Sequence, residues 1–559
     1  MASLAQYNGV LDRRKAAHLL RRATFGPTKE EIDQFTGLSV AQAVNTLYEE
    51  QLAPEAPIDP NTGQTWVEAP IPEERPEGHM SMVLGWWMDQ MKNSGANIRE
   101  RMVYFYHTHF TTKNDKVTDS VAIYYQNALF RQFAVGNFKE ICRRICLDNA
   151  MTIFLDGKSN IKGRPNENFG REFLELYTIG KGPQVGEDDY TTYTELDVQE
   201  AARVLSGYQE DRTYANIDLE TELPTINFRG NGIIAGQHDA TPKTFSERFN
   251  NAVIAPPVEE MQGDNTTIEG ALDELDQLVE MIFAQDETAR YICRRLYRFF
   301  VYYEITEEVE QDVIEPLAQT FRDNNYELQP VLTQLLSSEH FFDTDNATEV
   351  DDNHGAIIKS PLELVIGSMR YFRVELPDPA SELPAFYDAY RSILRSLNDQ
   401  GLDLYNPFEV AGYPAYHQAP SFNRNWISAN FLALRYLFID NLMSNPEDGF
   451  VLDIIDFVRD PANNFQPAEA TNLVQALVEY LFPEIITQER FDYFIDTFLD
   501  VPNSPELSPA EIQALRDQEV INWGLDWNTF INTNDDTGIR TSLENLVNVL
   551  LQTPEYQLF

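Results

Sequence analysis

The residue types and spacing best suited to chemistry occur in one segment, residues 154–177, where a polar loop is followed by a helical pattern. At about 100° per residue, Glu167, Arg171 and Glu175 fall within about 80° of one another on a helix. Glu172 extends this polar sector to roughly 140°. Carboxylates that share a face repel each other, so water, basic partners or a bound cation must relieve the repulsion. The pattern therefore predicts a concentrated, mixed charge on one face.

This charged face has a catalytic interpretation. Glu172 or Glu175 would act as general acid and base, and Arg171 would hold an anionic group of the substrate. The side chains expected to bind and orient the substrate are Asp156, Asn160, Asn166, Glu167, Asn168 and Arg203. Two other interpretations stay open: a structural Arg–Glu network in which Arg203 is an additional cation, and a freely solvated face. The loop residues of the set also favour local hydrogen bonds with the backbone.

A second candidate cluster is the run YHTHF at residues 106–110. On a continuous helix His107 and His109 would project about 200° apart, so they could bind one ion only if the helix ends there. Residues 111–115 have the composition of a helix exit, which would let both imidazoles face one pocket. A pair of histidines facing one pocket could bind a divalent metal ion as cofactor. His107 is in addition a candidate catalytic residue. The alternative is a pair of hydrogen-bonded core histidines.

Other motifs with a known mechanism are missing from the sequence. There is no GxSxG elbow, no HExxH, no P-loop and no GxGxxG after a predicted strand. The sequence therefore contains none of the motifs that usually indicate a serine hydrolase of that type, a zincin, an NTPase or a dinucleotide-binding enzyme. His238 and Asp239 lie together in a long Gly-containing connection, but this pair alone indicates no chemistry.

The elements that must position these residues are mostly helices. Apolar residues recur at three- and four-residue spacing along most of the chain, for example over 272–283. We therefore predict a mainly α, multi-helical fold of two or three helical lobes, with long irregular loops and little β structure. The stretches rich in Pro, Gly, Asn and Asp that should form these loops are residues 52–76, 181–194, 211–268, 375–384 and 400–425.

The predicted domain organisation follows these loops. An N-terminal helical lobe with the candidate motifs would span 1–215, and a middle helical lobe would span 269–375. Residues 216–268 would form an irregular connection and residues 376–425 an irregular loop region. A C-terminal helical lobe would span 426–559.

Composition restricts the function classes. The 559 residues include 89 Asp and Glu against 42 Lys and Arg, a formal net charge of −47, so binding to a nucleic-acid backbone is not expected. Hydrophobic residues make up 43%, enough for a folded interior. The three cysteines suggest neither a disulfide framework nor a four-ligand zinc site. We predict no transmembrane segment and see no secretory signal at the N-terminus.

Several motifs together resemble an uncharacterised bacterial family, domain of unknown function 1800. The matching runs, in chain order, are AHLLRRATFGPT at 17–28, YHTHF at 106–110, LDG at 155–157, PNENFGRE at 165–172, YTE at 193–195 and KSPLE at 359–363. The resemblance spans nearly the whole chain. The run YPAY at 413–416 stands where many members have a Gly-Trp-Pro segment, and it resembles a Bacteroidetes-like branch.

The resemblance implies a mostly helical fold but no established activity. Genes of this family often neighbour those of a sulfatase-like family, domain of unknown function 1501, many of whose members are exported. By this analogy, a sulfatase-like protein would be a partner, and the chain would work outside the cytoplasm. The missing signal departs from many exported relatives and leaves the compartment open.

Two functions follow from these observations. The first is a hydrolase-like or substrate-modifying protein with a polar cleft of carboxylate, Arg and His side chains, acting on a polar, carbohydrate-like or sulfated substrate. The second is a non-catalytic scaffold for an exported sulfatase-like enzyme or for a homo-oligomer, with the aromatic loop 413–426 as interface anchor.

Overall fold

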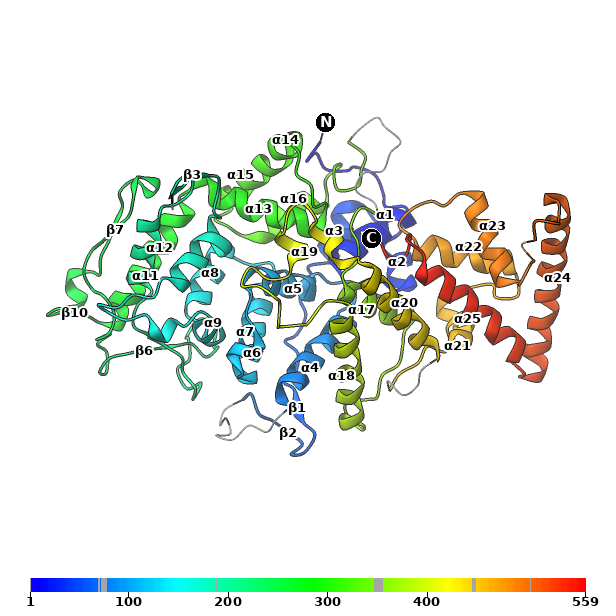
Figure 1. Cartoon of the computed structure of the whole chain (residues 1–559), viewed down its shortest axis with the longest axis horizontal. Helices are drawn as coiled ribbons and strands as arrows, with labels where there is room; N and C mark the ends of the chain where they lie inside the picture. The colour runs from blue at the N-terminus through cyan, green and yellow to red at the C-terminus, as the bar shows by residue number, and fades with distance from the viewer. Residues whose placement is uncertain are drawn as a thin grey trace.

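The computed structural model describes residues 2–68, 71, 78–187, 189–345, 355–444, 449–502 and 504–559. The structure is 55% helical and 7% in short strands, which confirms the predicted mainly α class with little β structure. Along its longest axis the molecule runs from an end with small strands, through a helical centre, to a second helical end (Figure 1). Among the described helices, none is long and apolar enough to cross a membrane.

The helical centre starts with the N-terminal third of the chain. Its helices are α1 (Arg13–Ala23), α2 (Lys29–Phe35), α3 (Val40–Thr46), α4 (His79–Lys92), α5 (Arg99–His109), α6 (Asn114–Val117) and α7 (Ser120–Gln132). Strands β1 (Ile58–Asp59) and β2 (Gln64–Thr65) pair antiparallel before α4. Helices α4, α5 and α7 pack against one another, which makes α5 a central element of the fold.

The end with small strands contains the segment that carries the charged face (Figure 1). Its helices are α8 (Phe138–Cys146), α9 (Asn149–Phe154), α10 (Asn168–Glu172), α11 (Glu195–Val204) and α12 (Ile268–Phe283), with a 3₁₀ turn η1 (Gly157–Ser159) and a π-helical segment η2 (Phe173–Thr178). The strand pairs are all antiparallel: β3 (Gln184–Gly186) with β4 (Asp189–Tyr190), β5 (Tyr208–Gln209) with β6 (Asn227–Phe228), β7 (Lys243–Thr244) with β8 (Val253–Ile254), and β9 (Met261–Gln262) with β10 (Asn265–Thr266).

The chain then returns to the centre and continues to the far end. The central helices are α13 (Asp286–Phe300), α14 (Glu307–Val309), α15 (Glu315–Asp323), α16 (Leu328–Leu336), α17 (Pro361–Tyr371), α18 (Leu383–Asp399), α19 (Pro414–His417) and α20 (Ala429–Ser444), with π turn η5 (Glu310–Ile314) between α14 and α15. The helices of the far end are α21 (Ile454–Arg459), α22 (Ala470–Leu481), α23 (Gln488–Phe498), α24 (Pro509–Thr533) and α25 (Thr537–Gln552). Further 3₁₀ turns are η3 (Glu247–Phe249), η4 (Val258–Glu260), η6 (Phe422–Trp426) and η8 (Pro461–Asn463).

Local sequence signals explain several helix starts. Helix α17 begins with a capping box in which Ser360 and Glu363 bond to each other's backbone amides, and Pro361 occupies its first turn. Helix α24 begins in the same way at Ser508 and Glu511. These reciprocal bonds satisfy amide donors that a helix start would otherwise leave without partners.

One hydrophobic core connects the three parts of the molecule. Buried apolar residues in mutual contact extend from Leu11 to Tyr556. Helix α1 contacts α22, and the loop after α1 reaches α17, where a Cβ on Gly26 would lie 2.8 Å from the Cα of Gly367. The first helices therefore lie in the centre of the molecule, between the two ends (Figure 1). The predicted lobe boundaries at 215, 268, 375 and 425 stay predictions.

Candidate functional site

Asn160 anchors the loop that precedes α10 and the charged face. This side chain is only 1% exposed and donates to the carbonyl oxygens of Ala202, at 2.7 Å, and Leu205, at 3.0 Å. Its Oδ1 accepts from the backbone N–H of Asn166 at 3.1 Å. Asn160 therefore joins the loop to the C-terminal end of α11, where helix carbonyls need donors.

The other polar loop residues shape the start of α10. The Oδ1 of Asn166 accepts from the N–H of Asn168 at 3.0 Å, and its Nδ2 donates to the Oγ of Ser159 at 2.6 Å. Asn168 donates to the carbonyl of Leu155 at 3.3 Å. Asp156 adopts a left-handed conformation, with φ 56°, and forms an ion pair of 2.8 Å with Lys116. These contacts fix the loop geometry.

Helix α10 lies unusually close to α11 because of Gly170. A Cβ at this position would come 2.8 Å from the backbone nitrogen of Ala202 and 3.0 Å from the carbonyl oxygen of Val198. Such contacts would force the helices apart, so the absence of a side chain permits the crossing.

The charged face is not carried by one regular α-helix. From Phe173 to Thr178 the backbone is π-helical, with i→i+5 hydrogen bonds. The hydroxyl of Thr178 donates to the carbonyl of Phe173 at 2.6 Å within this segment. The uniform 100° spacing used for the sequence therefore holds up to Glu172 but not to Glu175. Isolated π turns occur frequently at functional sites.

Two of the three acids on this face have firm partners. Glu175 accepts from Lys181 at 3.0 Å and from the hydroxyl of Tyr193 at 2.9 Å. Arg171 donates to Glu195 at 3.0 Å and to Glu167 at 3.2 Å. The guanidinium lowers the pKa of Glu195, whereas burial and the nearby Glu195 raise the pKa of Glu167. Ion pairs therefore relieve most of the predicted repulsion.

Glu172 differs from these neighbours. Its half-buried carboxylate makes no hydrogen bond or ion pair with any residue that the structure describes. Burial and the charge of Glu175 raise its pKa from 4.5 to about 7, while Arg171 and Lys181 act in the opposite direction. Glu172 is therefore present in both protonation states near neutral pH.

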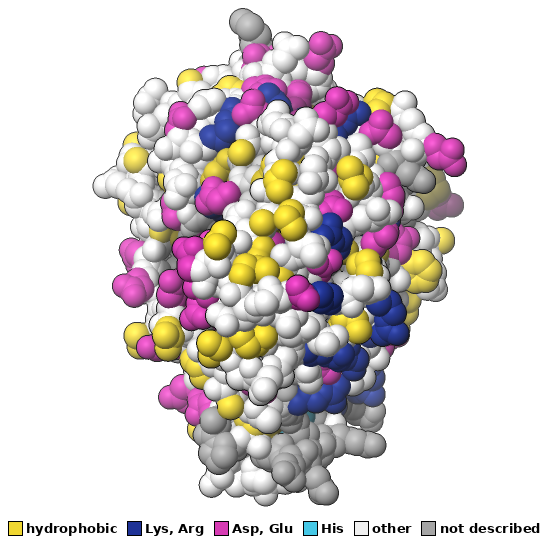
Figure 2. Space-filling model, turned by 90° about the vertical axis from the view of Figure 1, so that its left-hand side faces the viewer, with side chains coloured by type: hydrophobic (Ala, Val, Ile, Leu, Met, Phe, Trp, Pro, Cys, Tyr) yellow, Lys and Arg dark blue, Asp and Glu magenta, His cyan; other side chains and the backbone are white. Residues whose placement is uncertain are grey.

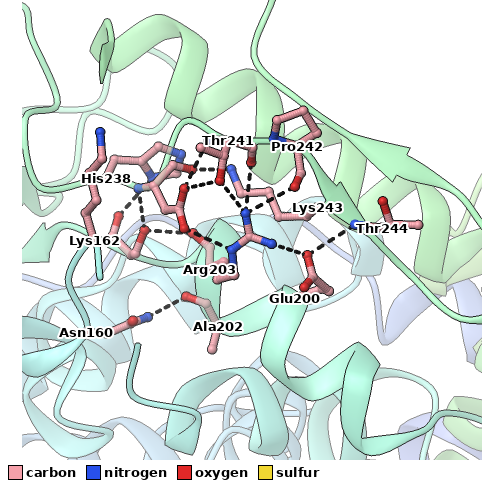
Figure 3. A network of polar contacts seen from close by, with 12 residues as sticks. Asn160, Lys162, Glu200, Ala202, Arg203, His238, Thr241, Pro242, Lys243 and Thr244 are labelled. Carbon is pink, nitrogen blue, oxygen red and sulfur yellow. Dashed lines mark hydrogen bonds and ion pairs between the residues drawn. The ribbon is translucent and has the colours of Figure 1, made fainter. Parts of the chain in front are cut away.

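Arg203 of α11 belongs to a separate network, with Glu200 and the 238–244 segment (Figure 3). Its guanidinium pairs with Asp239 at 2.9 Å and with Glu200 at 2.5 Å, and it donates to the carbonyl of Pro242 at 3.1 Å. The paired guanidinium holds the pKa of Asp239 well below its usual range. The structure thus places Arg203 with the 239–244 segment, apart from Arg171.

A fully buried charge cluster adjoins Arg203. Glu274 of α12 bonds to both His238 and Lys243, and all three side chains have no exposed surface. The Nδ1 of His238 lies 2.9 Å from the carbonyl oxygen of Ser206, while its Nε2 faces Glu274. Both ring nitrogens therefore lie within hydrogen-bonding distance of oxygen atoms. The cluster ties the 238–243 segment to α12.

The two histidines of the YHTHF run are buried and point to different elements. The Nε2 of His107 lies 3.1 Å from the hydroxyl of Tyr413, and the Nε2 of His109 lies 2.9 Å from the carbonyl oxygen of Tyr177. Burial lowers the pKa of each to about 3, so both are neutral. Among the described residues, no group of three or more His, Cys, Asp or Glu side chains is arranged to hold a metal ion.

The end of α5 holds three elements together, which the sequence did not reveal. Tyr177 brings η2 to His109, and Tyr413 brings the 400–413 loop to His107. From α13, Arg295 donates to the carbonyl oxygen of Thr108 at 3.3 Å. The helix does end after His109, as the sequence predicted, but its exit serves as a junction of elements.

A shallow hollow lies beside the charged face. It has a volume of ≈ 590 Å³ and is lined by Ser159, Arg164, Pro165, Asn166, Glu167, Asn168 and Arg171. Four of the predicted site residues, Asn166, Glu167, Asn168 and Arg171, therefore share one hollow. Glu172 and Glu175 follow Arg171 in the sequence but do not line the hollow, and neither do Asp156, Asn160, Arg203, His107 and His109. Sequence analysis missed Arg164, as well as Glu195 and Lys181, which pair with residues of the face.

Fold and site define a mainly α-helical protein with a charged face, on which the carboxylate of Glu172 has no partner among the described residues, next to a shallow polar hollow. The family model described as a protein of unknown function (DUF1800) matches residues 18–558, nearly the whole chain. The chain belongs to this family, which confirms the resemblance seen in the motifs. No curated protein and no solved structure matches it.

Proposed function

We propose that the chain is a hydrolase-like or substrate-modifying protein in which Glu172 transfers a proton to or from a polar substrate. The observation that carries this proposal is the half-buried carboxylate of Glu172, which has no bonding partner among the described residues. A general acid or base needs a side chain that is free to bond to the substrate. Its neighbours Glu175 and Glu167 are engaged by Lys181 and Arg171.

The acid–base properties of Glu172 support the same role. A pKa of about 7 gives comparable amounts of acid and base at neutral pH, the condition under which proton transfer by a side chain is most effective. The surrounding groups would act as positioning residues. Lys181 and Tyr193 hold Glu175, and Arg171 orders the polar wall of the hollow, where Asn166 and Asn168 would orient the substrate.

The test is the pair of variants Glu172→Gln and Glu259→Gln, the latter at an exposed glutamate outside the candidate site. Hydrolysis of 4-nitrophenyl glycosides and of 4-nitrophenyl sulfate would be followed by absorbance over pH 5–9. Removal of a general acid or base should lower kcat by about 10²–10⁴-fold. We expect this loss in Glu172→Gln, with kcat in Glu259→Gln close to that of the native chain and both variants folded by circular dichroism. Equal rates in native chain and Glu172→Gln would contradict the proposal.

A non-catalytic role in binding a partner protein or a second copy is the other candidate. It is favoured by the complete pairing of Arg203, Arg171 and Asn160, which are all committed to contacts within the chain. In that case the charged face stiffens the molecule. Glu172→Gln would then leave every tested reaction unchanged, and size-exclusion chromatography with light scattering would show an assembly.

A further inference from the structure

One cation beside the charged face is uncommitted. Arg164 is exposed and lines the same hollow as Arg171. Its side chain makes no hydrogen bond, ion pair or cation–π contact with any residue that the structure describes. Arg171, by contrast, is held by Glu195 and Glu167. Arg164 is therefore the charged side chain of the hollow that is available to a ligand.

The turn that carries Arg164 is fixed in place. Its backbone closes by a bridge between Ile161 and Arg164, and the N–H of Lys162 donates to the carbonyl of Gln237 at 2.7 Å. The ammonium of Lys162 donates to the carbonyl of Asp264 at 2.6 Å. Since Lys162 anchors the turn, the guanidinium of Arg164 extends from a rigid base, and less conformational entropy is lost when it binds a ligand.

The local charge is opposite to that of the chain as a whole. Residues 157–166 contain Lys158, Lys162 and Arg164 and no acid, although acids outnumber bases 89 to 42 overall. Lys158 is only loosely paired, 3.5 Å from Glu210, and Arg212 shares the same carboxylate at 3.4 Å. Figure 2 shows Lys and Arg side chains gathered toward the lower right of this end of the molecule. The 157–166 loop therefore carries a net positive charge in a chain that is strongly acidic as a whole.

The hollow offers suitable chemistry for an anion. Asn166 and Asn168 line the hollow together with Arg164, and each side-chain amide has a second N–H beyond the one bonded within the loop. The acid that lines the hollow, Glu167, is compensated by its ion pair with Arg171. A guanidinium can donate two parallel hydrogen bonds to the oxygens of a sulfate, phosphate or carboxylate group.

We infer that this hollow binds an oxyanion group carried by the substrate, a sulfate ester, phosphate ester or carboxylate, with Arg164 as its main contact. This inference rests on the proposed function and specifies the substrate class of the same site. Arg164 would bind the anion. Arg171 would act only as a positioning residue, because its guanidinium already donates to the carboxylates of Glu195 and Glu167.

The test compares Arg164→Gln with Arg212→Gln in the full chain. Arg212 is an exposed arginine of the same basic region that does not line the hollow. Binding of a sulfated disaccharide, its desulfated form, inorganic sulfate and inorganic phosphate would be measured by isothermal titration at constant ionic strength. Loss of one charged contact should weaken binding of the sulfated disaccharide about tenfold. We expect this loss in Arg164→Gln and a change below about twofold in Arg212→Gln.

A higher affinity for inorganic phosphate than for inorganic sulfate would indicate that the substrate is a phosphate ester. A higher affinity for inorganic sulfate would indicate a sulfate ester. Either result supports the inference. Equal affinity for the sulfated and desulfated disaccharides, or equal weakening in both variants, would overturn it. Glu172→Gln separates the two proposals, because it should leave the affinity for the sulfated disaccharide unchanged. If anion binding persists while Glu172→Gln has full activity, the proposed function fails and the oxyanion site stands.

Discussion

Two charge clusters at the same end of the molecule, one around Glu274 of α12 and one around Glu172, use similar residue types differently. Around Glu274 the carboxylate, His238 and Lys243 are completely buried and bonded to one another. Around Glu172 the side chains are half-buried, and the central carboxylate has no partner among the described residues. The difference shows that acids, bases and histidines in one cluster do not by themselves indicate chemistry. Accessibility and an unsatisfied bonding capacity are needed as well.

The largest effect should follow from breaking the buried cluster. Glu274→Gln leaves the buried ammonium of Lys243 without its counter-charge and removes the carboxylate that faces His238. Removing one partner of a buried ion pair costs about 3–5 kcal/mol of unfolding free energy. We expect a loss of this size in urea unfolding followed by circular dichroism.

The matched control for that prediction is Glu269→Gln, on the same helix α12 but exposed. It should change the unfolding free energy by less than about 0.5 kcal/mol. A cost below about 1 kcal/mol for Glu274→Gln would mean that the cluster is wet or unpaired in solution, and the contrast between the two regions would disappear.

A smaller effect, of opposite sign, is expected at Glu172. Since folding raises the pKa of this carboxyl from 4.5 to about 7, the folded state binds the proton more tightly than the unfolded state. The resulting stabilisation is fully present below pH 4.5 and is lost as the pH rises through about 7. Relative to the native chain, Glu172→Gln should therefore become more stable at pH 8 by about 1–2 kcal/mol, allowing for solvent screening.

Urea unfolding at pH 5 and pH 8 measures this difference. Glu175→Gln is an informative comparison, because it removes the acceptor of Lys181 and Tyr193 and should destabilise the chain instead. The same stability difference between native chain and Glu172→Gln at both pH values would show that Glu172 titrates as an ordinary surface acid.

The smallest effect is expected at Arg171. This side chain is 34% exposed, and its ion pairs with Glu167 and Glu195 are open to solvent. Partly exposed pairs of this kind contribute about 0.2–1 kcal/mol. Arg171→Gln should therefore lower the unfolding free energy by less than about 1 kcal/mol, and by less still at 0.5 M NaCl. A loss approaching that of Glu274→Gln would place Arg171 among the structural ion pairs.

The sequence predicted the class of fold because that class depends on local spacing. Apolar residues over 272–283 repeat as one side of a helix requires, and α12 spans Ile268–Phe283. The motif run at 165–172 likewise indicated a helix start, and α10 begins at Asn168. The family could be recognised for a related reason, since its motifs are short runs of neighbouring residues.

The site was only partly predictable, because its pairings connect distant segments. Arg203 meets Asp239 36 residues later, and His107 meets Tyr413 after 306 residues. No spacing rule indicates such contacts. The π-helical turn was also missed, since it depends on how the backbone packs and has no distinctive residue types. Glu195 was visible within a family motif, but its bond to Arg171 was not.

The π-helical turn between Glu172 and Thr178 has a consequence for how this protein tolerates change. A π turn contains one residue more than the α turn it replaces, so deleting a single residue there would tighten the coil and rotate Lys181 and everything after it relative to α10. The distance between the carboxylates of Glu172 and Glu175 therefore depends on the number of residues in this turn, as well as on their types. Inserting or deleting one residue in the turn would change the electrostatic repulsion between these two carboxylates, although both glutamates would still be present.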